Sequence, residues 1–240
     1  GEIARSSMPG QFINVQVNTD PLSAPVLRRP FAVSDVNGDE FEFIFNIVGR
    51  GTKLLYDILR SKETVNVLGP LGNGFNLGDA ERKKLLVAGG IGIAPVKRLA
   101  GHLSGSESEV TFIWGNRSGG DFFGTDYFDK KNIRFLMSTD DGTAGFRGNV
   151  LDLLKKNTEA GIIAELKKYD IFVVGPDPMM KAVAGYIESQ GARCQISLET
   201  PMACGMGVCQ GCAVKKRSSQ DYFLVCKDGP VFYSDQIELN

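Results

Sequence analysis

Four of the five cysteines lie close together in the last part of the sequence, with the spacing C-x4-C-x2-C-x13-C. They are Cys204, Cys209, Cys212 and Cys226. The first three match the plant-type spacing of [2Fe-2S] ligands. Glycines between them permit unusual backbone angles and leave amide groups free to point at sulfur. We therefore expect these four thiolates to hold a two-iron cluster.

Other uses of the four cysteines stay open at this stage. A four-cysteine zinc site typically uses two close pairs, and Cys226 has no C-x2-C mate. Disulfides are typical of small secreted domains, whereas this chain is long enough to fold without them and opens without an apolar signal core, so we expect a reducing, cytoplasmic setting. Cys194 falls outside the spacing, in an expected strand, and is predicted to be a small buried side chain.

A second feature is the run from Leu85 to Pro95, which has the pattern of a strand, a glycine turn and a helix start. The turn holds Gly89, Gly90 and Gly92. Backbone N–H groups at such a turn can receive a pyrophosphate. The run is not a G-x-G-x-x-G fingerprint, and no carboxylate ends the next strand, so close helix–strand packing is the alternative interpretation.

No group of residues suited to acid–base or nucleophilic catalysis is found. His102 is the only histidine and has no nucleophile or carboxylate arranged around it in the sequence. The run 140–142 is Asp-Asp-Gly, which is first a turn signal, and the basic run 215–217 is expected to be a solvated loop. We therefore predict no catalytic side chain.

The elements that position these residues fall into three segments. In residues 1–80, alternating patterns at 12–17, 41–48 and 65–68, with one helix at 52–59, predict an antiparallel barrel or sandwich. In residues 81–198, strands expected at 85–88, 110–114, 133–137, 171–174 and 194–197 alternate with helices at 94–102, 150–157 and 178–190, which predicts an α/β parallel sheet that binds ligands at the carboxyl ends of its strands. Residues 199–240 are too irregular for a core of their own, and an inorganic centre would organise this arm. The fold class is thus multi-domain α+β.

Composition excludes two classes of partner. The 27 Lys and Arg residues against 28 Asp and Glu residues give a formal net charge of −1, so no broad positive field attracts nucleic acid. The longest stretch without a charged or strongly polar side chain is too short for a spanning helix, which needs about 20 apolar residues. We expect neither nucleic-acid binding nor a membrane span.

The three segments, in this order, resemble the ferredoxin-NADP reductase superfamily and, within it, the electron-transfer subunits of NAD-dependent dihydroorotate dehydrogenases. The run Arg28-Arg29-Pro30-Phe31-Ala32-Val33-Ser34 resembles the R-x-aromatic-Ser/Thr flavin motif. The resemblance implies that Arg29 meets the FAD phosphates and that Pro30, Phe31 and Ala32 line the isoalloxazine. Ala32 stands where the family usually has Ser or Thr, so a hydroxyl near the flavin is missing.

The same resemblance implies further cofactor-binding residues. Gly49-Arg50-Gly51-Thr52 corresponds to a helix start that holds the FAD pyrophosphate, and the implied flavin-binding residues there are Asn46, Val48, Gly51 and Thr52. The glycine turn would cradle NAD, and Gly175, Pro176 and Asp177 would lie near the nicotinamide. The runs Glu199-Thr200-Pro201-Met202-Ala203-Cys204-Gly205 and 226–232 are the most specific matches to the subunit.

By this resemblance the chain is an oxidoreductase subunit that uses FAD, a [2Fe-2S] cluster and NAD. Electrons would arrive singly through the cluster and leave from FAD to NAD as a hydride. The partner would be the FMN-containing, dihydroorotate-oxidising subunit of a heterotetramer. The family's barrel begins with a strand before residues 9–12, for which this sequence has only a stub. A sister subunit serving ferredoxin, NADPH or sulfur reduction is the nearer alternative, and a zinc-stabilised binding module is the more distant one.

Overall fold

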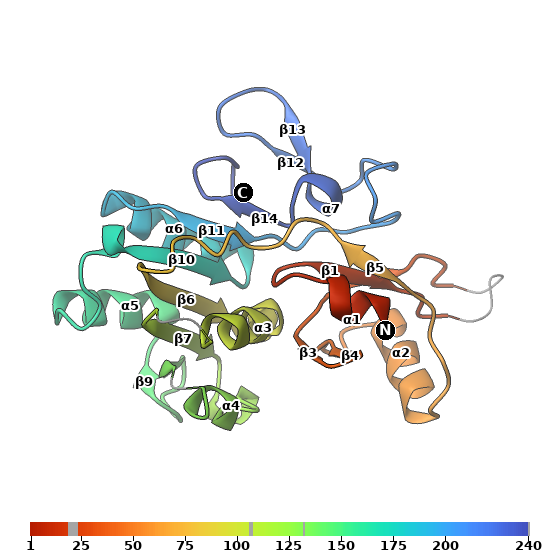
Figure 1. The fold of residues 1–240 in the computed structure, drawn as a ribbon, viewed down its shortest axis with the longest axis horizontal. Helices are drawn as coiled ribbons and strands as arrows, with labels where there is room; N and C mark the ends of the chain where they lie inside the picture. Colours follow the sequence, from red (N-terminus) through yellow and green to blue (C-terminus); the bar gives the residue numbers. More distant parts are fainter. Residues whose placement is uncertain (19–23, 106–107, 132, 240) are drawn as a thin grey trace.

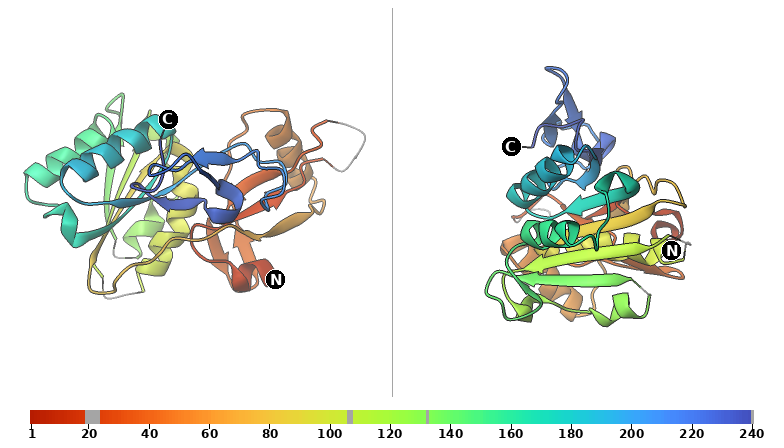
Figure 2. Two further views of the ribbon diagram at one scale, coloured as in Figure 1. Left: turned by 90° about the horizontal axis from the view of Figure 1, so that it is seen from above. Right: turned by 90° about the vertical axis from the view of Figure 1, so that its left-hand side faces the viewer.

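The computed structural model describes residues 1–18, 24–105, 108–131 and 133–239. A β-rich half holds the N-terminus, an α/β half follows it, and the last residues form a small arm that projects beyond the edge of the main sheet (Figure 1, Figure 2). Within the described residues, no helix is long and apolar enough to cross a membrane.

The β-rich half is built on a small antiparallel sheet. Strand β1 lies in the centre with β2 and β5 on its two sides, and β3 and β4 form a separate hairpin. The strands are β1 (Phe12–Val15), β2 (Arg29–Ala32), β3 (Asp35–Asn37), β4 (Glu40–Glu42) and β5 (Val67–Leu71). Helix α2 (Arg50–Arg60) covers the helix expected at 52–59, and Leu55 anchors it in a core with Ile13, Val15 and Val33.

One expectation for this half differs from the structure, and another is not confirmed in detail. The strand expected over 41–48 is a strand only as far as Glu42, because Phe43 and Phe45 pack against Phe31 at ring-centroid distances of 5.3 and 5.5 Å while their backbone joins no ladder. In the described residues the sheets of this half comprise three and two strands, and the barrel is not confirmed in detail. The stub before β1 is helix α1 (Glu2–Ser6).

The α/β half contains a seven-stranded sheet in the order β14-β11-β10-β6-β7-β8-β9. All five strands expected from the sequence are confirmed, and their parallel pairing is confirmed with them. The strands are β6 (Lys83–Gly89), β7 (Val110–Asn116), β8 (Arg134–Thr139), β9 (Phe146–Arg147), β10 (Tyr169–Val174), β11 (Cys194–Ser197) and β14 (Val231–Tyr233).

Helices cover both faces of this sheet. Leu85 and Val87 of β6 join the core that contains α5 (Val150–Glu159) and α6 (Asp177–Ser189), whereas Leu86 and Ala88 join the core that contains α3 (Ile93–Leu103) and α4 (Asp126–Asp129). Alternate residues of a strand point to opposite faces, so a strand buried on both sides must be apolar throughout. The continuous run Leu85–Ala88 meets that requirement.

The arm is joined to the α/β half by backbone pairing. Strand β14 pairs antiparallel with β11, so the C-terminal arm supplies the edge strand of the main sheet, which the sequence did not predict. The rest of the arm contains the hairpin β12 (Ala213–Lys215) with β13 (Tyr222–Leu224) and the short helix α7 (Val225–Asp228). Cys212 and Cys226 are buried in the core shared with the sheet.

Candidate functional site

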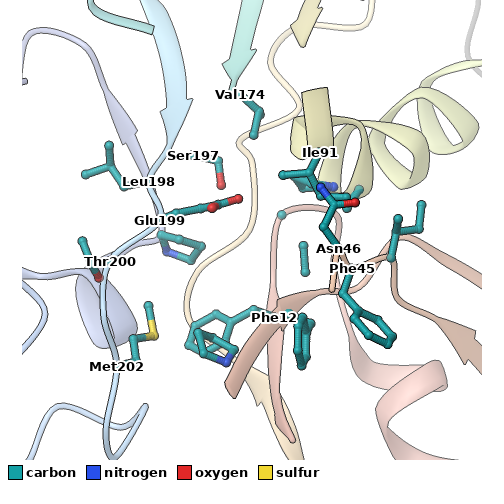
Figure 3. Close-up of a pocket in the computed structure, with 18 of the residues that line it drawn as sticks. Phe12, Phe45, Asn46, Ile91, Val174, Ser197, Leu198, Glu199, Thr200 and Met202 are labelled. Atoms are coloured by element: carbon teal, nitrogen blue, oxygen red, sulfur yellow. The ribbon is translucent and has the colours of Figure 1, made fainter. Parts of the chain in front are cut away.

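A cavity of about 470 Å³ lies where the β-rich half, the start of α3 and the segment 197–202 meet (Figure 3). Six of the residues expected to bind flavin line it. They are Pro30, Phe31, Ala32, Asn46, Val48 and Thr52. Two separate sequence motifs therefore converge on one cavity, whose size suits a bound organic cofactor. Most of this lining is apolar, which suits a flat aromatic ring.

Arg29 and Gly51, the other two expected flavin residues, lie next to each other beside the cavity. A Cβ built on Gly51 would be 3.2 Å from Nε of Arg29, so glycine lets the guanidinium reach the start of α2. Oγ1 of Thr52 accepts hydrogen bonds from the backbone N–H groups of Val48 (3.0 Å) and Gly49 (3.2 Å) and fixes this helix start. A guanidinium beside a helix N-terminus is suited to a pyrophosphate.

The glycine turn and the residues after β10 also meet. A Cβ on Gly92 would lie 2.5 Å from the carbonyl oxygen of Val174, and a Cβ on Gly175 would lie 3.0 Å from the backbone nitrogen of Gly89. Glycine at these positions is therefore required by close approach of two chain segments. Gly90 has φ +52° and no neighbour within 4 Å of a built Cβ, so one side of the turn is open.

The six residues expected to bind NAD lie beside the cavity rather than in its wall. Pro176 precedes α6 and Asp177 begins it, at the carboxyl end of β10. Ile91 of the turn and Val174 at the end of β10 both line the cavity. A ligand on the glycine turn would thus adjoin a ligand in the cavity, at the edge of the sheet where parallel α/β folds bind ligands.

The cysteines lie in two pairs within the arm, and all five in the chain are free thiols. Sγ of Cys204 accepts hydrogen bonds from the backbone N–H groups of Met206 and Cys209, each 3.4 Å long. Hydrogen bonds from the backbone amide of Cys209, then from that of Met206, together with the Cys209 side chain, lower the pKa of the Cys204 thiol to about 6. The loop therefore favours a thiolate at this position before any metal is bound.

The second pair is buried. Sγ of Cys212 lies 3.3 Å from Sγ of Cys226, and the backbone N–H of Gly207 donates to Sγ of Cys226 over 3.1 Å. Burial, and then the neighbouring Cys212, raise the pKa of the Cys226 thiol to about 12. Two thiols this close together, with a backbone amide donating to one of them, are suited to metal ligation. Binding of the metal removes the protons of both thiols. Within the described residues, no three His, Cys, Asp or Glu side chains are grouped around a single metal-ion position.

The arm packs directly on the β-rich half. Nδ2 of Asn14 in β1 donates to the carbonyl oxygen of Cys204 over 3.5 Å, and a Cβ on Gly205 would lie 2.7 Å from the same nitrogen. Phe12, two residues earlier in β1, lines the cavity. The cysteine loop and the cavity are therefore connected through one short strand.

Several lining residues received no role from the sequence. Phe12 and Phe45 line the cavity from the β-rich half, and the segment after β11 contributes Glu199, Thr200 and Met202 (Figure 3). The available signal was position, because Glu199 lies two residues after the parallel strand β11, whose carboxyl end faces the ligand-binding edge. Burial, and then the charge of Asp177, raise the pKa of Glu199 above its ordinary value.

Three features that the sequence set aside behave as expected, whereas the basic run 215–217 begins in strand β12 and forms ion pairs instead of a solvated loop. His102 is exposed, and Cys194 is 1% exposed in β11, where burial raises the pKa of its thiol to about 12. The Asp140–Gly142 run is a turn, with Gly142 at φ +78°. Lys215 and Arg217 form ion pairs with Glu238 and Glu188, respectively.

Comparison with known proteins first defines the class. Residues 86–185 match the family model of the oxidoreductase NAD-binding domain, and residues 199–238 match that of the iron-sulfur cluster binding domain of dihydroorotate dehydrogenase B. The solved structure of an NADH-dependent reduced ferredoxin-NADP oxidoreductase is similar to the chain, with a TM-score of 0.81 and 28% identity over 99% of this chain and 82% of the other. A ferredoxin NADP+ reductase from Neisseria gonorrhoeae, 15% identical with a TM-score of 0.63 over 77% of this chain and 80% of that one, shares the fold. The chain is an NAD-linked flavin and iron-sulfur oxidoreductase subunit.

The particular family follows from the sequence relatives. The dihydroorotate dehydrogenase B (NAD(+)) electron transfer subunit of Fusobacterium nucleatum is 37% identical over 96% of this chain and 87% of its own length. The corresponding subunit of Lysinibacillus sphaericus is 36% identical over 100% and 90%. The chain belongs to the family of dihydroorotate dehydrogenase B electron transfer subunits. The predicted family, and with it the cofactors FAD, [2Fe-2S] and NAD, is confirmed.

Proposed function

We propose that this chain takes electrons from a dihydroorotate-oxidising, FMN-containing partner and delivers them to NAD+ in pyrimidine biosynthesis. The observation that carries the proposal is the order of three adjoining parts. The cysteine loop contacts β1 through Asn14, β1 lines the cavity through Phe12, and the cavity adjoins the glycine turn through Ile91. Such a row suits stepwise electron transfer from one bound group to the next.

The proposal assigns a task to each group of side chains. Cys204, Cys209, Cys212 and Cys226 hold the [2Fe-2S] cluster. Arg29 and the start of α2 at Gly51 and Thr52 hold the FAD pyrophosphate, while Pro30, Phe31, Ala32, Asn46 and Val48 hold the rest of the flavin. Gly89, Gly90 and Gly92 bind NAD, with Gly175, Pro176 and Asp177 beside its nicotinamide. These residues follow the boundaries 1–80, 81–198 and 199–240 for the flavin, NAD and cluster segments.

The chemistry itself belongs to the cofactors, since a bound cluster passes electrons singly and a bound flavin exchanges them singly or in pairs. The chain contributes placement and exclusion of water. Phe12, Phe31 and Phe45 supply apolar surface to the cavity, and the open side of the glycine turn at Gly90 leaves space for the nicotinamide nucleotide at its edge. No side chain is required to abstract a proton from dihydroorotate, because that step takes place on the partner.

The partner and its stoichiometry belong to the same proposal. The relatives are electron transfer subunits by name, which implies a catalytic partner, and we propose a heterotetramer of two chains of each kind in the cytoplasm. The cysteine loop exposes Met206, Val208 and Cys209, which give it an apolar surface suited to contact with a partner.

The test begins with anaerobic purification of the chain. Its visible absorbance, iron and sulfide content and low-temperature EPR spectrum are recorded before and after addition of NADH. We expect flavin and cluster bands that both bleach, together with a [2Fe-2S] signal in the reduced sample. Mixing with a dihydroorotate-oxidising FMN subunit should then give dihydroorotate-dependent reduction of NAD+. A colourless protein containing zinc would refute the proposal, and a yellow protein without iron would refute the role of the cluster.

A further inference from the structure

A second hollow, of about 400 Å³, lies at the opposite end of the main sheet from the cofactor cavity. Asp170 near the start of β10 lines this hollow, whereas Val174 at the end of β10 lines the cofactor cavity. Four residues of extended strand separate the two positions, a distance of about 13 Å. The hollow is therefore a separate feature, at the edge of the sheet that the proposed electron transfer does not use.

Three cationic side chains from three different segments line this hollow. Arg82 precedes β6, Lys167 belongs to the short helical turn Leu166–Lys168, and Arg193 precedes β11. Asp170 is the one carboxylate among the lining residues. Its Oδ1 accepts a 2.9 Å hydrogen bond from Nε of Arg82, and its Oδ2 pairs at 2.7 Å with Nζ of the buried Lys84. The carboxylate is thus neutralised within the wall.

Lys167 and Arg193 provide the uncompensated charge. In the described part of the chain, Nζ of Lys167 has no carboxylate partner within ion-pair distance. Arg193 stacks on the ring of Tyr233 at 4.1 Å and has one long ion pair, 3.8 Å, with Asp235, in which both side chains are more than half exposed. An exposed pair of this length contributes little, while stacking holds the guanidinium in place. Two positive charges therefore face one hollow.

The shape of the hollow depends on two glycines. A Cβ on Gly78 would lie 2.1 Å from Oδ2 of Asp170, and a Cβ on Gly191 would lie 2.6 Å from Cε of Lys167. Both glycines have φ near +70°, a conformation that side chains rarely adopt. The backbone of these two glycines thus packs against Asp170 and Lys167, which both line the hollow.

We propose that this hollow binds a phosphorylated small molecule, with Lys167 and Arg193 as its anchoring residues. A phosphate monoester carries about two negative charges at neutral pH, which matches Lys167, without an ion-pair partner in the described part of the chain, and Arg193, whose one ion pair is long and exposed. The volume lies within the range of small-molecule sites. The fork of Arg193 and the mobile ammonium of Lys167 are the donors that phosphate binding uses most often.

The bound molecule would act on the joint between the two halves. Gln195 lines the hollow, and its side-chain amide bonds both backbone groups of Asn76, accepting from N at 2.8 Å and donating to O at 2.6 Å. Asn76 and Gly78 belong to the segment that leads from the β-rich half into β6. A ligand bound in the hollow should therefore stabilise the folded chain, including this connecting segment, by mass action.

The test uses the full chain loaded with flavin and cluster, with inorganic phosphate and pyrophosphate as probes. Calorimetric titration and thermal unfolding are measured with NAD+ at saturating concentration, so that the nucleotide site is already filled, and with chloride at matched ionic strength as the reference. We expect saturable binding and a melting temperature that rises with probe concentration. Absence of saturable binding, or its disappearance once NAD+ is added, would overturn the proposal.

Matched variants identify the residues. The double variant Lys167→Ala/Arg193→Ala should bind pyrophosphate about tenfold more weakly or worse, since it loses two charge-assisted contacts. Lys168→Ala removes the adjacent lysine, which pairs with Glu165 instead, and should bind as the wild type does. Equal affinity in the double variant and the wild type contradicts the proposal. Unchanged flavin absorbance and unchanged melting without probe show that the variants are folded.

Discussion

At the scale of single residues, the cysteine loop combines two environments. Cys204 lies in an exposed loop where backbone amides favour its thiolate, whereas Cys226 is buried next to Cys212 and its raised pKa favours the thiol. Loss of protons from the buried pair has to be compensated by the charge of a metal. The loop thus favours the thiolate of Cys204 before a metal is bound, whereas the Cys226 thiolate is stabilised only by ligation.

Replacement of one exposed ligand tests this arrangement. Cys209→Ser should abolish the cluster, because serine oxygen is a poor substitute for a thiolate at a two-iron centre. The fold and flavin content should persist, since Cys209 is exposed and lies outside the core. Iron and sulfide analysis with visible spectroscopy is the measurement. Cys194→Ser is the matched control and should retain full iron, and iron loss in that control would contradict the assignment.

Glu199 gives a prediction about pH. Its raised pKa means that the folded protein holds this proton more tightly than the unfolded chain does. Its contribution to stability is therefore complete below the ordinary pKa of 4.5 and is lost as pH rises through the raised value. Glu199→Gln removes this titration, so the variant should melt higher than the wild type at mildly alkaline pH, with the difference vanishing near pH 4.5.

Melting temperatures of the two proteins, measured across that pH range in one cofactor state, decide the question. Glu165→Gln is the control, since Glu165 is exposed and pairs with Lys168 at the surface. It should show no comparable gain at alkaline pH. A pH-independent difference between Glu199→Gln and the wild type would mean that the carboxylate is not the cause.

At the scale of elements, the turn between β6 and α3 is fixed by its contact with the end of β10. Gly92→Ala would place a methyl group 2.5 Å from the backbone oxygen of Val174, which cannot move without disturbing the sheet. Overpacking of this kind costs about 1–3 kcal/mol. We expect that loss in the free energy of unfolding from denaturant titration, together with weaker NADH binding.

Gly120→Ala is the matched control for this substitution. Gly120 is exposed, and a Cβ built there has no neighbour within 4 Å. Its free energy of unfolding should change by less than about 0.5 kcal/mol, as for ordinary surface substitutions. Similar losses in both variants would show that the close approach of Gly92 and Val174 is not the source of the effect.

Elements that depend on local pattern were predictable from the sequence. Continuous apolar runs such as Leu85–Ala88 predicted the parallel strands, because every side chain of a strand that is buried on both faces must be apolar. The alternation at 41–48 was misleading, since Phe43 stacks on Phe31 and Phe45 without strand pairing. Pairing of β14 with β11 has no local signal, because it joins segments that are distant in the sequence. Glu199 was missed as a lining residue although its position after β11 was an available signal, because the cavity also needs residues of the β-rich half, which are distant in the sequence.

At the scale of the whole molecule, the cavity exists only while the two halves keep their orientation. A polar cluster on α3 helps to fix it. Nζ of Lys97 lies 2.6 Å from Oε2 of Glu42 and 3.3 Å from Oδ2 of Asp35, both on the hairpin β3–β4 of the other half. Tyr127 packs beside this lysine at 5.1 Å. Burial, and then the charges of Asp35 and Glu42, raise the pKa of Tyr127 to about 12, so the phenol stays neutral beside both carboxylates.

Lys97→Met keeps the length of the side chain and removes its charge, which leaves Asp35 and Glu42 facing each other without a cation. Partly buried ion pairs in a small network contribute about 1 kcal/mol, which corresponds to a fall of about 2–4 °C in the melting temperature of a chain of this size. Because α3 also begins at the glycine turn, we expect slower reduction of the flavin by NADH at unchanged flavin and iron content. Lys53→Met is the matched control, since its pair with Asp57 lies within α2 alone and is more than half exposed. If both variants reduce flavin at the wild-type rate, the lysine cluster does not set the orientation of the halves, and the apolar contacts around the cavity must do so.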